Sequence, residues 1–185
     1  AGYKAVLLGA NAIGKFLPML TTAAGTVRPA KTLTLGAGVA GLQVLATFRR
    51  LGAVMEAFDV RPAVKEQCES LGAKFLEIEM DDMEDEGGYA KELSEDQHKL
   101  EMEMLTESVK DKDIVITTAQ IPGRTAPILI TKEMVEGMMP GSAIVDLAAE
   151  TGGNCELTKA GETVEHNGVK LIGPVNLAAT MPFHA

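Results

Sequence analysis

Three glycines and one aspartate stand at a spacing that could do chemistry together. Gly36, Gly38 and Gly41 form the pattern Gly-x-Gly-x-x-Gly. In such a turn the first glycine permits a tight bend, the second lets the backbone approach a pyrophosphate, and the third brings a helix close to a strand. Asp59 follows 23 positions after Gly36, where an acidic side chain binds ribose hydroxyls. The four residues predict a dinucleotide-binding site, with phosphates at a helix N-terminus.

The segments around these residues predict the elements that position them. Residues 31–35 are aliphatic and β-branched and indicate a strand, residues 42–51 a helix, and residues 53–58 a second strand that runs to the aspartate. A helix over 62–71 begins with proline and is followed by glycine, the usual punctuation of a helix. With a third strand over 73–78, these elements form β-α-β-α-β, one mononucleotide-binding half.

The second half of the chain continues this alternation. The apolar runs 113–119 and 142–148 predict buried parallel strands, and residues 131–138 predict a helix between them. The Asn-Gly pair within 164–173 indicates either a hairpin or a turn that leads into a sixth strand. The fold class is therefore α/β, a Rossmann-type doubly wound parallel sheet.

The strand over 113–119 should meet the first strand at the switch point of the sheet. Ligands of open α/β sheets bind in that crevice. Thr118, Ala119 and Gln120, with the loop 121–124, are therefore candidates for contact with the adenosine half of a dinucleotide. An ordinary turn between strand and helix is the alternative for these residues.

The first 24 residues carry apolar positions at helical spacing, and Gly25 is placed like a helix C-cap. A helix ahead of the first strand is not part of the minimal fold. We expect residues 1–25 to bridge from an upstream domain and residues 26–185 to form the Rossmann domain, which makes the chain a fragment of a larger subunit.

An acidic segment interrupts the pattern. Of the 26 acidic residues in the chain, 13 lie between positions 77 and 107. Within it, residues 81–93 predict a long loop with a hinge at Gly87 and Gly88 and one aromatic residue, Tyr89. Long loops in compact domains are often functional, so we expect either a mobile lid or a solvated charged connection. A helix capped by Ser94 should follow and run to about residue 109.

The identity of the nucleotide depends on two neighbouring side chains. Asp59 would accept hydrogen bonds from both ribose hydroxyls and would repel a 2′-phosphate, which favours NAD over NADP. Arg61 is only two residues further on, and an arginine there could instead accommodate that phosphate.

Composition excludes several classes of function. A formal net charge of −9 argues against nucleic acid and anionic membrane surfaces as partners, since both attract basic patches. No apolar run approaches the roughly 20 residues that span a bilayer. Cys68 and Cys155 lack a metal-ligand spacing, so we expect buried or idle thiols.

The sequence offers no convincing acid or base for hydride chemistry. His98, His166 and His184 are scattered, with no carboxylate or cysteine at ligand spacing, and each is expected at the surface. No Ser-His-Asp pattern occurs. We assign no catalytic and no metal-binding residue, and we expect the catalytic half of the site to lie elsewhere.

Several motifs together resemble the NAD(H)-binding domain of proton-translocating NAD(P) transhydrogenases, of the alanine dehydrogenase/transhydrogenase superfamily. They lie at residues 1–6, 36–41, 59–61, 87–92, 117–123 and 146–154. The resemblance covers nearly the whole chain. It includes Gly-Gly-Tyr-Ala-Lys-Glu at 87–92, which is similar to that family's mobile loop and which the related alanine dehydrogenases lack. The family commonly has Leu where Gln120 stands and Gln where Glu101 aligns.

This resemblance implies hydride transfer from NADH to NADP⁺, coupled to proton movement through separate membrane segments. It also implies that Val39, Asp59, Val60, Arg61, Gly88 and Gln120 line an NAD site, whereas the nicotinamide-facing residues belong to a preceding domain. Motif and resemblance together give these candidate cofactor-binding residues: Gly36, Gly38, Val39, Ala40, Gly41, Asp59, Val60, Arg61, Gly88, Tyr89, Thr118, Ala119 and Gln120.

The implied partners are an NADP(H)-binding component and a membrane component, with a homodimer of the NAD(H)-binding component at the cytoplasmic or mitochondrial matrix face of a membrane. Two other functions stay open. One is an alanine-type amino-acid dehydrogenase with Glu150 near its substrate, against which the acidic insertion speaks. The other is a non-catalytic nucleotide-sensing module.

Overall fold

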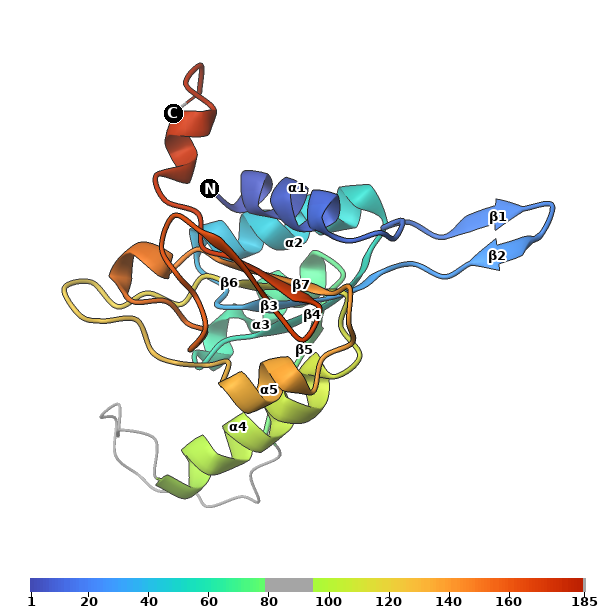
Figure 1. Ribbon diagram of the computed structural model, residues 1–185. Coiled ribbons are helices and arrows are strands. Elements are labelled where there is room, and N and C mark those ends of the chain that lie inside the picture. Colours follow the sequence, from blue (N-terminus) through green and yellow to red (C-terminus); the bar gives the residue numbers. More distant parts are fainter. Residues whose placement is uncertain (79–94, 185) are drawn as a thin grey trace.

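The computed structural model describes residues 1–78 and 95–184. Over these residues a seven-stranded sheet runs in the order β5-β4-β3-β6-β7-β9-β8 (Figure 1). Its strands are β3 (Lys31–Leu35), β4 (Val54–Phe58), β5 (Lys74–Phe75), β6 (Ile114–Thr117), β7 (Ala143–Asp146), β8 (Thr163–His166) and β9 (Val169–Ile172). Neighbouring strands pair in parallel, except that β8 pairs with β9 in the antiparallel sense. The predicted Rossmann-type sheet is confirmed, with the switch point between β3 and β6.

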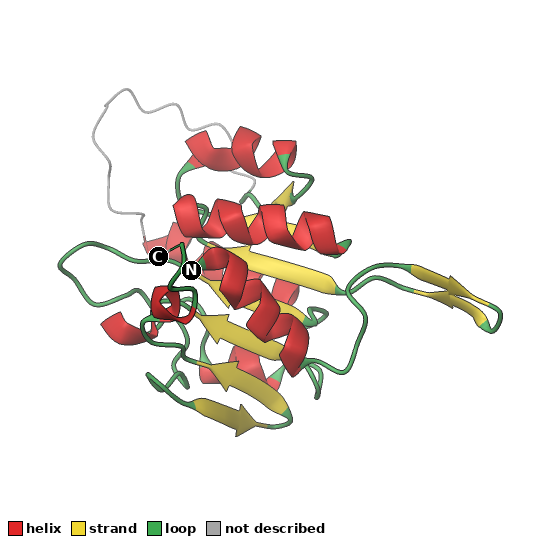
Figure 2. Ribbon diagram, turned by 90° about the horizontal axis from the view of Figure 1, so that it is seen from above, coloured by secondary structure: helices red, strands yellow, loops and turns green. Residues whose placement is uncertain are grey.

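Helices cover both faces of the sheet (Figure 2). They are α1 (Gly2–Ala12), α2 (Val39–Leu51), α3 (Lys65–Ser70), α4 (Glu95–Val109) and α5 (Lys132–Glu136), with short 3-10 turns η1 (Pro62–Val64), η2 (Ala149–Thr151) and η3 (Leu177–Thr180). Strand β6 shows how the faces form, because side chains alternate along a strand. Ile114 and Ile116 pack with α1, α2 and α3, whereas Val115 packs with α4 and α5.

The predicted N-terminal helix over residues 1–24 was wrong in its extent. Helix α1 ends at Ala12, and Ile13 is already extended. The following segment contains Pro18, which a helix interior does not tolerate. Residues 20–27 then form an antiparallel ribbon of β1 (Leu20–Thr22) and β2 (Gly25–Val27) that projects from the body of the domain (Figure 1). Gly25 is the first residue of β2, directly after the turn, with φ of 121°, and is not a helix cap.

Helix α1 also forms part of the domain core. Its residues Ala5 and Val6 are fully buried, and a Cβ at Gly2 would overlap the carbonyl oxygen of Ala40 in α2. The two helices therefore pack with their backbones close together. Helix α1 covers the same sheet face as α2, and the upstream domain that it is expected to bridge from stays a prediction.

Other expectations agree with the structure more closely. The Asn-Gly hairpin is confirmed, with Asn167 and Gly168 at φ of 50° and 77°, as a type I′ turn requires. The third strand is shorter than predicted, since β5 contains two residues. Helix α4 ends at Val109, as expected. The predicted lid at 81–93 and the Ser94 cap lie outside the described residues.

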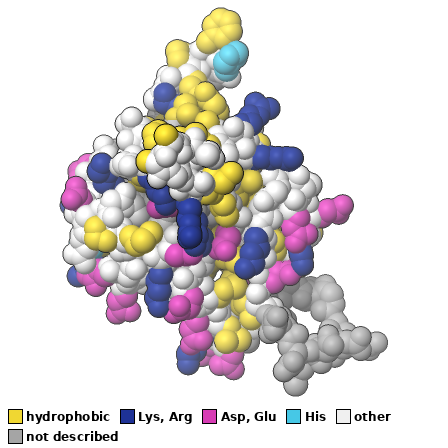
Figure 3. All heavy atoms as spheres, turned by 90° about the vertical axis from the view of Figure 1, so that its right-hand side faces the viewer, with side chains coloured by type: hydrophobic (Ala, Val, Ile, Leu, Met, Phe, Trp, Pro, Cys, Tyr) yellow, Lys and Arg dark blue, Asp and Glu magenta, His cyan; other side chains and the backbone are white. Residues whose placement is uncertain are grey.

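The amino ends of the strands, which Figure 3 views, carry side chains of both charges close together. Asp113, just before β6, accepts hydrogen bonds from the Lys15 ammonium at 3.0 Å and from the Lys31 backbone at 2.8 Å. Asp111 pairs with the Lys31 ammonium at 2.7 Å. The exposed Lys31–Asp111 pair contributes at most about 1 kcal/mol. Together these interactions fasten the segment after α1 to β3 and β6, at the end of the sheet opposite the glycine turn.

Candidate functional site

Most of the candidate residues come together at the carboxyl ends of β3, β4 and β6. A cavity of about 340 Å³ lies there. From the predicted set its lining includes Gly36, Gly38, Asp59, Val60, Arg61, Thr118, Ala119 and Gln120. Val39, Ala40 and Gly41 form the first turn of α2 beside it. Gly88 and Tyr89 lie outside the described residues, so their predicted role stays a prediction.

The glycine turn is held between β4 and β6. The Gly36 N–H donates to the Phe58 carbonyl at 2.8 Å, and the Thr118 hydroxyl donates to the Gly36 carbonyl at 3.0 Å. Gly36 has φ of 97°, a conformation that favours glycine. A Cβ at Gly41 would overlap the Gly36 carbonyl oxygen. The first and third glycines of the motif are therefore required by the backbone itself.

Gly38 has a different environment. A Cβ built there meets no atom within 4 Å among the residues that the structure describes. The first N–H groups of any α-helix have no intrahelical partner. Gly38 is the N-cap of α2 and has no side chain that could accept a hydrogen bond from them. Val39 at that end is 92% exposed. The arrangement leaves an open helix N-terminus, which suits an anionic group.

Asp59 stands at the end of β4 with all its acceptor positions in use. Oδ2 accepts from the Ala37 N–H at 2.7 Å and from Arg61 Nη2 at 2.9 Å. Oδ1 accepts from the Arg61 backbone N–H and from Arg61 Nε, both at 2.9 Å. A carboxylate offers about four lone-pair positions. A ribose hydroxyl could therefore bind Asp59 only if the Arg61 side chain gave up its place.

The electrostatics keep this carboxylate ionised. Burial alone would raise the pKa of Asp59, but the hydrogen bonds from the Arg61 side chain and the Ala37 N–H outweigh it, and the pKa lies below its usual value of 3.8. Asp59 is 6% exposed as a side chain, whereas Arg61 is 58% exposed. The carboxylate is thus fixed and charged, and its cationic partner has room to move into solvent.

Glu101 joins the cavity to a second one on the other side of Asp59. The second cavity has a volume of about 410 Å³ and shares Phe58, Asp59, Val60 and Glu101 with the first. Glu101 is 9% exposed on a helix whose other acidic residues face solvent. Burial raises its pKa, and the charge of nearby His98 opposes that shift only in part. Nothing in the sequence pattern alone marked Glu101 as buried.

Glu101→Gln is expected to raise stability at pH 7, because the substitution removes a charge that burial disfavours. The pKa of Glu101 is raised in the folded state. The folded state therefore loses stability as pH rises above the ordinary pKa, and the loss is complete once pH has passed the raised pKa and the buried carboxyl is ionised. The gain should therefore be present at pH 7 and vanish below the ordinary value of 4.5. Thermal unfolding at pH 4 and pH 7 measures it. Glu103→Gln, on the exposed side of α4, is the control, and an equal gain there would contradict the explanation.

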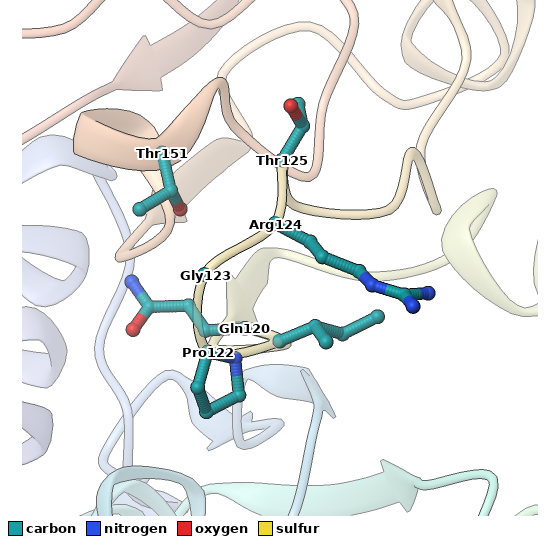
Figure 4. Close-up of a pocket in the computed structure, with 7 residues that line it drawn as sticks. Gln120, Pro122, Gly123, Arg124, Thr125 and Thr151 are labelled. Carbon is teal, nitrogen blue, oxygen red and sulfur yellow. The ribbon is translucent and has the colours of Figure 1, made fainter.

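Gln120 begins the loop that leaves β6. Its amide donates to the Leu147 carbonyl at 3.1 Å. Together with residues up to Thr125 and with Thr151 it lines an open depression of about 670 Å³. Figure 4 shows the Gln120 amide and the Arg124 guanidinium pointing to opposite sides of the loop. The structure thus brings Gln120 to the cavity, although its side chain is anchored to the end of β7.

Other reactive groups lie apart from this site. Cys68 and Cys155 are buried free thiols, as predicted, and burial raises the pKa of Cys155 to about 11. His166 contacts Glu136 at 2.9 Å on the surface. Among residues 1–78 and 95–184 there is no cluster of three His, Cys, Asp or Glu residues suited to a metal ion. Over the same residues no helix has the length and apolar character needed to cross a bilayer.

The chain is similar to known proteins over nearly its whole length. Residues 5–185 match the family model described as the alanine dehydrogenase/PNT C-terminal domain. An NAD(P) transhydrogenase alpha-subunit protein of Rhodospirillum rubrum is 53% identical over 180 residues, which is 96% of this chain and 47% of that protein. The crystal structure of transhydrogenase from Sinorhizobium meliloti superposes with a TM-score of 0.87 at 48% identity, over 97% of this chain and 48% of that one.

An L-alanine dehydrogenase structure is more distant. It has a TM-score of 0.73 at 27% identity, over 97% of this chain and 46% of that one. The chain therefore spans about half the length of these relatives.

Proposed function

The chain belongs to the alanine dehydrogenase/PNT C-terminal domain family, and we propose that it is the NAD(H)-binding component of a proton-translocating NAD(P) transhydrogenase. The observation that carries this proposal is the charged, fixed Asp59 beside the open N-terminus of α2. The identity of 53% to a transhydrogenase alpha subunit supports the choice within the family. In this function a hydride passes from NADH to NADP⁺, and partner components bind NADP(H) and carry protons across a membrane.

The residues fit NAD in three places. The N–H groups at the start of α2 would bind the pyrophosphate, and Gly38 leaves space for it. Asp59 would accept hydrogen bonds from the adenosine ribose, after the Arg61 side chain swings away. Thr118, Ala119 and Gln120 form the wall from β6. We propose NAD over NADP because a 2′-phosphate would meet the Asp59 charge.

Hydride transfer between two nicotinamide rings moves no proton, so it needs positioning and exclusion of water more than an acid or base. This agrees with a site in which we assign no catalytic residue. Gly88 and Tyr89 of the proposed lid and the nicotinamide-facing residues of a preceding domain would complete the pocket. The complex would lie at the cytoplasmic or mitochondrial matrix face of its membrane.

The test is reduction of NADP⁺ by NADH in the complex assembled from the intact chain and its partner components. We expect transfer that depends on this chain and no oxidation of L-alanine. Turnover of L-alanine without NADP⁺ would favour the alanine dehydrogenase alternative. A specific observation supports that alternative: Glu150 lines a cavity of about 290 Å³ next to Gln120. Nucleotide binding without either reaction would favour a sensing module.

Arg61→Gln is expected to tighten NADH binding by about two- to fivefold. In the free chain the guanidinium occupies both oxygens of Asp59, so ribose must first break an exposed ion pair worth up to about 1 kcal/mol. Calorimetric titration with NADH measures the change. Lys65→Gln, which breaks the exposed pair with Glu77 nearby, is the control. Weaker binding by Arg61→Gln would mean that the guanidinium contacts the nucleotide instead.

We also propose that the chain forms a homodimer through the β1–β2 ribbon. An isolated two-stranded ribbon is at best marginally stable in water, and this one projects from the domain with Phe16 and Met19 about 60% exposed at its base. Replacing residues 20–27 with a short Gly-Ser turn should convert dimer to monomer in sedimentation experiments and leave the domain folded. A dimer that persists would place the interface elsewhere.

A further inference from the structure

A fully buried amide lies behind the wall of the 340 Å³ cavity. Asn154 follows the Gly152-Gly153 turn after β7, and its side chain is 0% exposed. Its Oδ1 accepts from the Ala119 N–H at 3.1 Å. Its Nδ2 donates to the Ala119 carbonyl and to the Pro127 carbonyl, both at 2.8 Å. One side chain therefore binds both backbone groups of Ala119 and reaches a second segment as well.

The orientation of this amide is set by its partners. Oδ1 faces an N–H donor, and Nδ2 faces two carbonyl oxygens. The flipped amide would face donor with donor and acceptor with acceptors. The backbone carbonyl of Asn154 also accepts from Leu129 and Ile130 N–H groups at 2.8 and 3.0 Å. Asn154 thus joins the loop after β6 to the segment 127–130.

These two segments form the same wall of the cavity. Ala119, Gln120 and Ile121 come from the first, and Pro127, Ile128 and Leu129 come from the second. Residues 59–61, which follow β4 on the other side of β3, also line the cavity. The position of the wall relative to these residues therefore depends on where Asn154 is held.

Asp146 at the end of β7 holds it. This carboxylate is 1% exposed. Its Oδ2 accepts from the Asn154 N–H at 2.7 Å and from the Cys155 N–H at 3.0 Å, and also from the Thr158 hydroxyl at 2.7 Å. Its Oδ1 accepts from the Thr117 hydroxyl at 2.9 Å. Charge-assisted bonds in a buried site are the stronger kind, so Asp146 fixes Asn154 to the sheet itself.

We propose that Asn154 is a positioning residue for the nucleotide: fixed by Asp146, it sets the place of the Ala119 and Pro127 segments before NADH binds. The proposal rests on the proposed function, since it takes the 340 Å³ cavity as the nucleotide site. It assigns nucleotide affinity to a residue that lines none of the cavities described above. Preorganisation of this kind raises affinity because the loops need not be ordered during binding.

The test begins with the unsubstituted chain in the absence of nucleotide. Hydrogen exchange at the Ala119 amide should be as slow as at the amides of β6, because the Ala119 N–H donates to the buried Asn154 side chain. Fast exchange there would overturn the proposal without any variant. NADH affinity is then measured for Asn154→Asp, which keeps the side-chain size but turns the Nδ2 donor into an acceptor facing two carbonyls. We expect binding weaker by about tenfold and faster exchange at Ala119.

Thr158→Val is the matched control. It removes a hydrogen bond to the same Asp146 carboxylate, but the Thr158 hydroxyl donates to Asp146 and not to the Ala119 or Pro127 carbonyls that Asn154 binds. It should lower the melting temperature and leave NADH affinity within about twofold. Equal loss of affinity in both variants, or unchanged affinity in Asn154→Asp, would overturn the proposal. If Asn154→Asp does not fold, Asn154→Ser takes its place with the same expectations. Failure of the unsubstituted chain to bind NADH would instead overturn the proposed function.

Discussion

Asp59→Ala is expected to weaken NADH binding by more than about tenfold. Hydrogen bonds to a charged acceptor contribute roughly 1.5–3 kcal/mol each, and about 1.4 kcal/mol corresponds to a factor of ten. The loss is larger than that expected for any other single contact of the site, because Asp59 is held in place by Ala37 and remains ionised. Calorimetric titration with NADH measures it.

Two controls make this result specific. Asp111→Asn removes one negative charge at the opposite end of the sheet and should leave affinity unchanged. The titration of Asp59→Ala is made well below its melting temperature, because the substitution leaves the buried Ala37 N–H without its acceptor and should cost about 1–3 kcal/mol of stability. Unchanged NADH affinity in Asp59→Ala would remove this carboxylate from the ribose site.

The charge of Asp59 also determines how stability and nucleotide binding depend on pH. Its pKa is lowered in the folded chain, so its contribution to stability is present above the ordinary value of 3.8 and is lost as pH falls through the lower, folded value. Binding through Asp59 should therefore be constant across neutral pH. The nucleotide affinity will follow that carboxylate only under acid conditions.

Gly41→Ala is expected to lower both stability and NADH binding, whereas Gly38→Ala is expected to lower NADH binding alone. A Cβ at Gly41 would overlap the Gly36 carbonyl oxygen, a backbone atom that cannot give way, so the turn must distort. Overpacking of this sort costs roughly 1–3 kcal/mol, and both stability and NADH binding should fall. At Gly38 the added methyl group meets nothing within 4 Å among the described residues. That variant should keep its melting temperature and lose affinity, because the methyl group occupies the space proposed for the pyrophosphate.

Thermal unfolding and NADH titration of both variants separate these outcomes. A Gly38→Ala variant with full affinity would show that no phosphate approaches this backbone. A Gly41→Ala variant with normal stability would show that the helix can shift away from β3 without loss. The two results are independent, since one tests the ligand and the other tests the packing.

The sequence predicted the parts of the site that local backbone rules determine. Gly36, Gly41 and the strands on either side follow from steric requirements that act within a few residues. Their spacing therefore placed Asp59 and the start of α2 at one edge of the sheet. The Asn-Gly hairpin was predictable for the same reason, because its turn type depends on two residues.

The parts that the sequence did not predict depend on contacts between distant segments. Asn154 is 35 positions from Ala119, and no local pattern indicates that one amide will bind a loop after another strand. Glu101 lies on a helix rich in acidic residues, and only its burial beside the cavities lined by Phe58 and Asp59 distinguishes it from exposed neighbours such as Glu103. The pairing of Arg61 with both oxygens of Asp59 likewise depends on side-chain conformations that spacing does not determine.

The β1–β2 ribbon shows a different limit. Helical spacing of apolar residues extended past Ala12 and predicted a longer helix, but Pro18 and the β-branched Thr21 and Thr22 favour extended backbone. The prediction followed the helical spacing of the apolar residues and gave these local signals too little weight. Gly25 then begins β2 with φ of 121°, a conformation that favours glycine.

The most direct test of the account is a calorimetric titration of the intact chain with NADH and, separately, with NADPH. We expect saturable binding of one NADH for each chain and binding of NADPH weaker by more than about tenfold, because Asp59 opposes a 2′-phosphate. Equal affinities for the two nucleotides, or no binding of NADH, would contradict it.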